Sequence, residues 1–518
     1  MTERVLVIGW DGADWDVLDP LLDQGEMPNL ADVIASGAKG VLRSTLPINS
    51  WAAWSTFLTG VHPGRHGVVD FVERDVARPG RRVPVSSSSI KAPTFFELLS
   101  QAGHEVRAAN IPVTFPPIPV RGRMIGGVAI PPGAGFIHPQ TWASELARRA
   151  PFPTNGMEWT RFDDGPSELV EEAARLVAQR SDSFEVLLEG SWSVATCVFV
   201  APDRLQHPMG AYVLPSHPDH PRLRETGLAE AIRGVFGLLD RQLGRLRDIA
   251  GADATVIVLS DHGFRPINRT ANLDRVLASL GLSFPTRTGE LARSLQRSNR
   301  VRRLLKTRIG RVVRSGTPRP QAFDWSRTLV YQSGSAGQLS INLSGREAQG
   351  VVDPRDHERV CSEAREALLG FRDPETGERP VGEVLLAREI YGGQHAEWAP
   401  DLIVLPSELW TFGHADALTG WTDWPTGSHR RAGIIAASGP GVAAGSLEER
   451  DIADLAPTVL ALVGASYDGF DGSEIRGLTG RRQTTAAVHD GGPTDRTDVS
   501  EDQQEAIAQH LRDLGYIE

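Results

Sequence analysis

Short runs of apolar residues alternate with amphipathic segments along most of the chain. Five runs are almost wholly apolar and rich in β-branched residues, namely 5–8, 197–200, 254–259, 402–405 and 433–437. Strands that are buried on both faces have this pattern. Residues 168–179 and 228–246 instead repeat their apolar positions at helical spacing. Because buried strands alternate with amphipathic helices, the pattern predicts an α/β fold: a doubly wound, mostly parallel sheet flanked by helices.

Two stretches interrupt this pattern. Residues 111–139 are rich in proline and glycine, which predicts loops that cross the active edge of the sheet. Residues 271–325 form an expected insertion, and its middle, 293–319, carries ten Lys or Arg residues, no acidic residue, and apolar positions at helical spacing. We interpret it as a basic helical cap, with recognition of an extended anionic substrate as the functional alternative. The expected domains are a catalytic core (1–270 and 326–480), the cap (271–325) and a polar C-terminal segment with a final helix (481–518).

Composition narrows the classes of function. The 518 residues include 54 basic and 65 acidic side chains, a formal net charge of −11, which disfavours specific or general binding of nucleic acid. The two cysteines are too few for a disulfide framework or a cysteine-based zinc module. No apolar run of about 18 residues and no signal peptide is visible, so we expect a protein without a transmembrane segment, located in the cytoplasm.

Charged and imidazole side chains follow the ends of the predicted strands. Asp11 follows the first run, Asp203 and His207 follow the run 197–200, and Asp261 and His262 follow the run 254–259. His429 instead lies in a Gly/Ser loop that leads into the run 433–437. Asp203 and His207 are four residues apart, so one helical turn places both on one face. Open α/β sheets form their sites at the carboxyl ends of the strands, where these residues are expected. Each residue alone has an ordinary structural explanation, and only the set as a whole indicates a metal site.

Ser50 precedes a segment with the pattern of a short helix. Trp51, Trp54 and Phe57 fall on one face, and Gly60 ends the segment. The free N–H groups and the positive dipole end at a helix N-terminus favour an anionic ligand and an ionised hydroxyl. The structural alternative is that Ser50 only caps the helix.

Taken together and in order, these residues resemble the metal signature of the alkaline phosphatase superfamily, in its type I phosphodiesterase/nucleotide pyrophosphatase branch. The resemblance includes the opening VIGWDGAD, the TGVHPGRHG after Ser50 and the late DIADLAPTVLALVG. It implies one metal ion held by Asp203, His207 and His429. It implies a second ion held by Asp11, Asp261 and His262, with Ser50 bridging toward it as the nucleophile. Oxygen and imidazole ligands favour two Zn²⁺ ions, with Mn²⁺ or Fe²⁺ as alternatives.

The resemblance implies a metal-dependent phosphohydrolase that cleaves phosphodiester or phosphomonoester bonds of a small phosphorylated substrate through a phosphoseryl intermediate on Ser50. A phosphomutase or phosphotransferase, and a catalytically silent metal-binding relative, are the alternatives. Where nucleotide pyrophosphatases commonly carry an asparagine after the HG motif, this chain has Asp70 and Phe71, which puts nucleotide specificity in doubt. The physiological substrate and the oligomeric state stay open.

Several neighbouring side chains have competing interpretations. Asn110 either contacts phosphate or forms a turn, and the turn is favoured. Arg65, Arg204 and Arg430 are expected at the surface, with a bidentate phosphate clamp as the alternative. His66, Asp14 and Asp16 are assigned structural or solvated roles.

Overall fold

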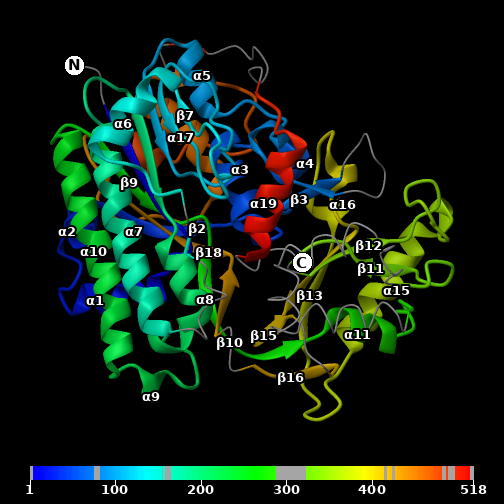
Figure 1. Ribbon diagram of the computed structural model, residues 1–518. Coiled ribbons are helices and arrows are strands. Elements are labelled where there is room, and N and C mark those ends of the chain that lie inside the picture. Colours follow the sequence, from blue (N-terminus) through cyan, green and yellow to red (C-terminus); the bar gives the residue numbers. More distant parts are fainter. Residues whose placement is uncertain are drawn as a thin grey trace.

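The computed structural model (Figure 1) describes residues 4–74, 82–154, 156–157, 165–286, 323–335, 337–413, 417–422, 426–480, 486–487 and 496–513. The predicted basic segment 293–319 lies outside these residues, so its role stays a prediction. The expected domain boundaries at 271 and 325 likewise stay a prediction.

A ten-stranded mixed sheet forms the centre of the molecule. Its strands follow the order β19-β2-β18-β9-β1-β8-β5-β6-β7, and β20 also pairs with β2. Their bounds are β1 (Val5–Trp10), β2 (Gly37–Arg43), β5 (Val106–Ala109), β6 (Gly122–Ile125), β7 (Ile137–His138), β8 (Val194–Phe199), β9 (Thr255–Leu259), β18 (Ala432–Ser438), β19 (Gly445–Ser446) and β20 (Arg450–Asp451). β9, β1, β8, β5 and β6 run parallel to one another, whereas β18 runs antiparallel to both β9 and β2. The predicted α/β fold with a mostly parallel sheet is confirmed.

Two groups of helices flank this sheet. The first comprises α1 (Trp15–Asp23), α2 (Pro28–Ala35), α7 (Pro166–Leu187), α8 (Ala201–Val213) and α10 (Gly227–Ala250). The second comprises α3 (Ser50–Thr59), α5 (Phe95–Gln101) and α17 (Leu455–Leu462). The two helices predicted from apolar spacing correspond to α7 and α10, which pack side by side (Figure 1). Their buried apolar faces join the strands in one large hydrophobic core.

A second, smaller sheet lies on the far side of β10 from α7 and α10 (Figure 1). It is antiparallel, in the order β11 (Val330–Gln332), β12 (Gln338–Ile341), β14 (Leu402–Pro406), β13 (Val381–Leu386). With α11 (Leu273–Ser279) and α15 (His357–Gly370) it buries a separate hydrophobic cluster. The apolar run at 402–405 is therefore a strand, as predicted, but it belongs to this second sheet and not to the central one. A run buried on both faces has the same sequence pattern in either sheet.

A third sheet links the two parts. β10 (Gly263–Ala271) pairs with β15 (Leu409–Phe412), β16 (Thr419–Trp421) and β17 (Gly427–Arg430). The other α-helices of the described residues are α4 (Pro63–His66), α6 (Ala143–Arg149), α9 (His220–Leu223), α16 (Ala387–Ile390), α18 (Arg476–Thr479) and α19 (Glu501–Asp513), the last close to the predicted final helix. β3 (Val72–Arg74) with β4 (Arg82–Pro84), and β21 (Ala465–Ser466) with β22 (Ala486–Ala487), form two small ribbons.

The proline- and glycine-rich stretch 111–139 is mostly irregular, but β6 and β7 lie within it and extend one edge of the central sheet. Edge strands tolerate proline and glycine nearby because fewer of their N–H groups are needed for pairing. In the described part of the chain, none of the helices combines the length and the apolar character that a membrane crossing requires.

Candidate active site

Five of the predicted residues lie at one edge of the central sheet, just after the ends of parallel strands. Asp11 directly follows β1, and Asp261 and His262 follow β9. Asp203 and His207 lie in α8, which begins just after β8. Because β1, β8 and β9 are neighbours that run the same way, their carboxyl ends meet at this edge.

His429 and Ser50 reach the same edge by other routes. β18 is antiparallel, so its first residue, Ala432, lies where its neighbours end, and His429 precedes it in β17. β2 runs antiparallel to β18 and hence parallel to β9, and its last residue, Arg43, leads into the loop before Ser50. All seven predicted site residues are therefore brought to one edge of the sheet.

Ser50 is the first residue of α3 and is not its cap. The side chain of Asn49 accepts a hydrogen bond from the Ala52 N–H at 2.9 Å and so caps the helix. The Ser50 hydroxyl is thereby left available, which removes the structural alternative weighed from the sequence. Its Oγ lies 3.2 Å from His262 Nε2 and 3.4 Å from Asp11 Oδ1. At the other end, Gly60 (φ 63°) terminates the helix as predicted.

Asp203 lies at the centre of the cluster. Its Oδ1 atom is 3.1 Å from His429 Nε2 and 3.3 Å from His207 Nε2. The same oxygen is 4.0 Å from His262 Nε2. Two groups of side chains have ligand atoms within 4.8 Å of one another: Asp203 with His207 and His429, and Asp203 with Asp11 and His262. The first group has the composition predicted from the sequence.

Asp261 sits at the edge of the second group. Its Oδ1 accepts a hydrogen bond from the Gly12 N–H at 3.1 Å. Its Oδ2 has no hydrogen-bond partner among the described residues and lies 3.4 Å from His262 Nε2. An unpartnered carboxylate oxygen in the interior is costly, so this atom is suited to a cation.

All three imidazoles present the same nitrogen to the cluster. Nδ1 lies 3.3 Å from the Gly427 carbonyl in His207, 3.2 Å from the Gly263 carbonyl in His262 and 3.2 Å from the Ile48 carbonyl in His429. A carbonyl only accepts, so Nδ1 carries the hydrogen and Nε2 keeps its lone pair. The Nε2 atoms of His207 and His429 are only 3.0 Å apart. Two facing lone pairs repel unless a cation lies between them, and a backbone carbonyl behind each ring is the usual support of a metal-binding histidine.

Burial and mutual repulsion perturb the carboxyl groups. Burial, with the nearby charges of Asp261 and Asp203, raises the pKa of Asp11 well above its ordinary value. Burial and the charge of Asp203 raise the pKa of Asp261 to about 7. Such crowding of acidic groups in the interior is relieved by a divalent cation.

Two of the imidazoles are held neutral. Burial lowers the pKa of His207, and burial lowers the pKa of His262 well below its ordinary value. A metal ligand must be unprotonated, so this shift favours coordination at neutral pH.

Two supporting residues had no signal in the sequence. Trp54 Nε1 donates to Asp11 Oδ2 at 2.9 Å and fixes that carboxylate from helix α3. The guanidinium of Arg265 donates to the carbonyls of His429, Ser407 and Trp410 at 3.2, 3.3 and 2.7 Å. Arg265 thus ties the His429 strand to the turn between β14 and β15. Both contacts join residues remote in the chain, where no local pattern indicates them.

The arginines weighed as phosphate clamps have protein partners. Arg65 Nη1 donates to Asp471 Oδ1 at 2.6 Å, and Arg430 Nε donates to Asp14 Oδ2 at 2.6 Å. Arg204 is buried, with its Nε 3.7 Å from Asp203 Oδ2.

The other side chains weighed from the sequence are structural. Asn110 has a turn conformation (φ 60°), and its Nδ2 donates to the Val198 carbonyl at 2.8 Å. His66 is buried, with Nε2 2.9 Å from Thr56 Oγ1. Asp70 is buried and accepts from the Ser335 and Phe71 N–H groups at 3.0 and 2.9 Å. Burial raises the pKa of Asp70.

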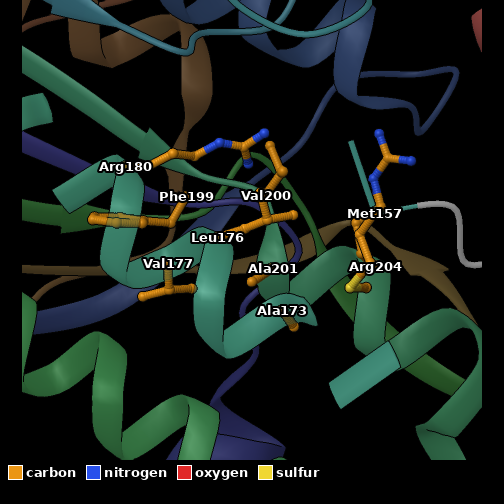
Figure 2. Close-up of a pocket in the computed structure, with 9 residues that line it drawn as sticks. All are labelled: Met157, Ala173, Leu176, Val177, Arg180, Phe199, Val200, Ala201 and Arg204. Carbon is orange, nitrogen blue, oxygen red and sulfur yellow. The ribbon is translucent and has the colours of Figure 1, made fainter. Parts of the chain in front are cut away.

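A small pocket is lined by residues of α7, β8 and α8, among them Arg204, the chain neighbour of Asp203 (Figure 2). Its lining is apolar except for Arg180 and Arg204. Burial and the charge of Arg204 lower the pKa of Arg180 to about 10. The seven predicted site residues do not line this pocket.

Comparisons with known proteins identify the family of the chain and support its fold. The sequence profile of the type I phosphodiesterase/nucleotide pyrophosphatase family matches residues 5–430. Comparison with curated protein sequences finds no match. The structure is similar to phosphonoacetate hydrolase from Sinorhizobium meliloti 1021 in complex with phosphonoformate, with a TM-score of 0.54 and 15% identity over 86% of this chain and 91% of that one.

It is also similar to human ectonucleotide pyrophosphatase/phosphodiesterase 5, with a TM-score of 0.53 and 15% identity over 91% of this chain and 97% of that one. At this identity the structural likeness establishes the fold, and the family profile covers the parallel strands of the central sheet from β1 to β9 and all seven residues at its edge. The chain therefore belongs to the type I phosphodiesterase/nucleotide pyrophosphatase family, and thereby to the phosphoester hydrolases.

Proposed function

We propose that the protein hydrolyses a small phosphorylated substrate with Ser50 as the nucleophile and two divalent metal ions as cofactors. The observation that carries this proposal is the convergence of three imidazole Nε2 atoms and three carboxylates around one hydroxyl at the helix start. Catalytically silent relatives have no need to hold so many buried acidic groups together, because their burial without a cation is costly.

The residues present fit two cations. Asp203, His207 and His429 would hold one, and Asp11, Asp261 and His262 would hold the other, as the family resemblance implies. Asp203 Oδ1 also lies within 4.0 Å of His262 Nε2, so its carboxylate is placed to contribute to both. Two divalent cations carry four positive charges and the three carboxylates carry three negative charges. The occupied site therefore has a net positive charge, which favours an anionic substrate. Imidazole and carboxylate ligands without thiolate favour Zn²⁺, with Mn²⁺ or Fe²⁺ as alternatives.

The bound ions would lower the pKa of the Ser50 hydroxyl and stabilise negative charge on the leaving oxygen. Ser50 Oγ then loses its proton to solvent and attacks phosphorus, so that the Oγ–P bond forms as the bond to the leaving oxygen breaks. Water hydrolyses the resulting phosphoserine, releases phosphate or a phosphomonoester and restores the hydroxyl. Ser50 is the first residue of α3, where the positive end of the helix dipole favours the anionic phosphoryl group.

The substrate approaches the half of the cluster formed by His207 and His429. Their side chains are 12% and 13% exposed, whereas those of Asp203 and His262 are 2% and 0% exposed. Phosphonoacetate hydrolase and ectonucleotide pyrophosphatase/phosphodiesterase 5 share the fold, so phosphonates and phosphodiesters are the substrate classes to test first.

Turnover of a matched substrate panel tests the proposed activity. The metal-loaded protein should hydrolyse at least one of a bis-aryl phosphate, a mono-aryl phosphate and a phosphonate monoester, and should leave a sulfate ester intact. Activity should disappear with a chelator and return with Zn²⁺ or Mn²⁺. Absence of turnover on every phosphorus ester would contradict the proposal.

Trapping the covalent intermediate tests the role of Ser50. Acid quenching during turnover, followed by peptide mass spectrometry, should locate a phosphoryl group on Ser50 and none on Ser55 of the same helix. Adding an alcohol acceptor separates a hydrolase from a phosphotransferase, because only a phosphotransferase would convert most of the substrate into a new ester.

A further inference from the structure

We infer that Asp14 is a positioning residue that holds three ligand-bearing segments of the active site in register. The inference rests on the proposed function, because it assigns Asp14 a role in metal binding. The sequence alone gives Asp14 only a structural or solvated role. In the structure its carboxylate is fully buried and contacts three segments that are remote from one another in the chain.

Both carboxylate oxygens of Asp14 accept hydrogen bonds. Oδ2 accepts from the Phe264 N–H at 2.8 Å and from Arg430 Nε at 2.6 Å. Oδ1 accepts from the Asp16 N–H at 2.8 Å and from Arg430 Nη2. The pair with Arg430 is therefore bidentate, the geometry in which a guanidinium fixes a carboxylate most firmly.

Each partner is next to a proposed ligand. Phe264 is two residues after His262, and Arg430 directly follows His429. Asp14 itself is three residues after Asp11. One carboxylate thus connects the segments after β1 and β9 with the strand β17 that carries His429, and displacement of any segment would move a ligand of the cluster.

Gly263 shows that the fold makes room for this carboxylate. A Cβ atom at Gly263 would lie 2.3 Å from Asp14 Oδ2 and 2.0 Å from the Ala432 carbonyl oxygen. A side chain at this position would therefore expel the Asp14 carboxylate from the Phe264 N–H. Gly263, between His262 and Phe264, has no side chain and therefore permits the contact.

Capping of helix α1 does not account for these contacts. The cap needs only Oδ1, which accepts from the Asp16 N–H. Oδ2 faces away from α1, toward Phe264 and Arg430, and a serine at position 14 would serve the cap without reaching either partner. The two roles can therefore be separated by substitution.

Zn²⁺ binding by metal-stripped, full-length protein tests the inference. The affinity is measured by competition with a chromophoric chelator for wild type, Asp14→Ser, Asp14→Asn and Arg430→Gln. The matched control is Asp16→Asn, because Asp16 Oδ2 also pairs with Arg430, at 2.9 Å, but is 44% exposed and is not bonded to Phe264. The melting temperature of each metal-stripped variant is recorded in parallel, and Co²⁺ absorption spectra report ligand geometry independently of activity.

We expect Asp14→Ser and Arg430→Gln to weaken Zn²⁺ binding by about 10- to 100-fold and to alter the Co²⁺ spectrum, as loss of a supporting residue does in other metal sites. Asp16→Asn should stay within about threefold of wild type. The double variant Asp14→Asn/Arg430→Gln should bind Zn²⁺ almost as well as whichever single variant binds it less tightly, because both substitutions remove the same Asp14–Arg430 contact.

Unchanged Zn²⁺ affinity in Asp14→Ser and Arg430→Gln would overturn the inference, even if their melting temperatures fell, and Asp14 would then be a helix cap alone. If Asp14→Ser does not fold, Arg430→Gln decides, because Arg430 is 32% exposed and its replacement leaves the α1 cap in place. Wild-type protein that binds no Zn²⁺, Mn²⁺ or Fe²⁺ would instead overturn the proposed function and this inference with it. Wild-type binding with unaffected variants leaves the proposed function standing.

Discussion

Replacing Ser50 with alanine removes one oxygen from the centre of the cluster and leaves its ligands in place. The hydroxyl makes only long contacts, 3.2 Å to His262 Nε2 and 3.4 Å to Asp11 Oδ1, so its loss should change the free energy of unfolding by no more than about 1 kcal/mol. Loss of a covalent nucleophile usually lowers kcat by at least about 10³-fold, which corresponds to roughly 4 kcal/mol of transition-state stabilisation. The predicted effect is therefore on catalysis and not on stability.

Ser55→Ala is the matched control. Ser55 lies in the same helix, is equally buried, and its Oγ has no hydrogen-bond partner among the described residues. Its removal should leave kcat unchanged and the free energy of unfolding unchanged or slightly higher, because an unsatisfied buried hydroxyl is lost.

The assay combines three measurements on each variant: steady-state hydrolysis of the best aryl ester, metal content by elemental mass spectrometry, and urea unfolding. We expect Ser50→Ala to keep two metal ions and nearly full stability while its kcat falls by three orders of magnitude or more. A kcat within tenfold of wild type, with metal retained, would refute the serine mechanism and point to direct attack by water.

Three further predictions concern the metal ligands, the helix cap and acid stability. Asp261→Asn and His207→Ala should each lower the metal content measured by elemental mass spectrometry, and full retention in both would contradict the ligand assignment. Asn49→Ala should lower the free energy of unfolding by about 1 kcal/mol and also lower kcat, because the cap of α3 is lost, whereas Asn49→Asp keeps the cap oxygen, loses the Nδ2 hydrogen bond to the Val69 carbonyl and should preserve kcat better than Asn49→Ala. Hydrogen bonds from His357 and Arg346 outweigh burial and lower the pKa of Asp401 from 3.8 to about 2, so its contribution is present above pH 4 and is lost as the pH falls toward 2. The gap in unfolding free energy between wild type and Asp401→Asn should therefore shrink by roughly 2 kcal/mol from pH 7 to pH 2, and a pH-independent gap would contradict this account.

The local elements could be predicted because their causes are local. An apolar β-branched run such as 254–259 disfavours every structure except a buried strand or helix segment, and its length favours the strand β9. The end of α3 at Gly60 follows from the conformational freedom of glycine. The placement of five of the seven site residues was equally visible, because they follow strand ends that the apolar pattern marks; Ser50 and His429 do not.

Contacts between remote segments could not be predicted in this way. Asn49, rather than Ser50, caps α3, and the adjacent residues are both good caps by type, so only the folded backbone distinguishes them. The run at 402–405 joins the second sheet because of its neighbours β12 and β13, whose pairing is set by chain topology.

The arrangement of the site was decided by tertiary structure. Residue type indicates that a histidine can bind a metal, but the carbonyl behind its Nδ1 determines which nitrogen faces the cluster, and for His429 that carbonyl belongs to Ile48. The ion pair of Asp14 with Arg430 spans 416 positions of the chain. The sequence by itself thus determined which chemical groups are present and which strand ends carry them. Only the closed fold decided their distances and orientations, because these depend on contacts between segments that no local pattern relates.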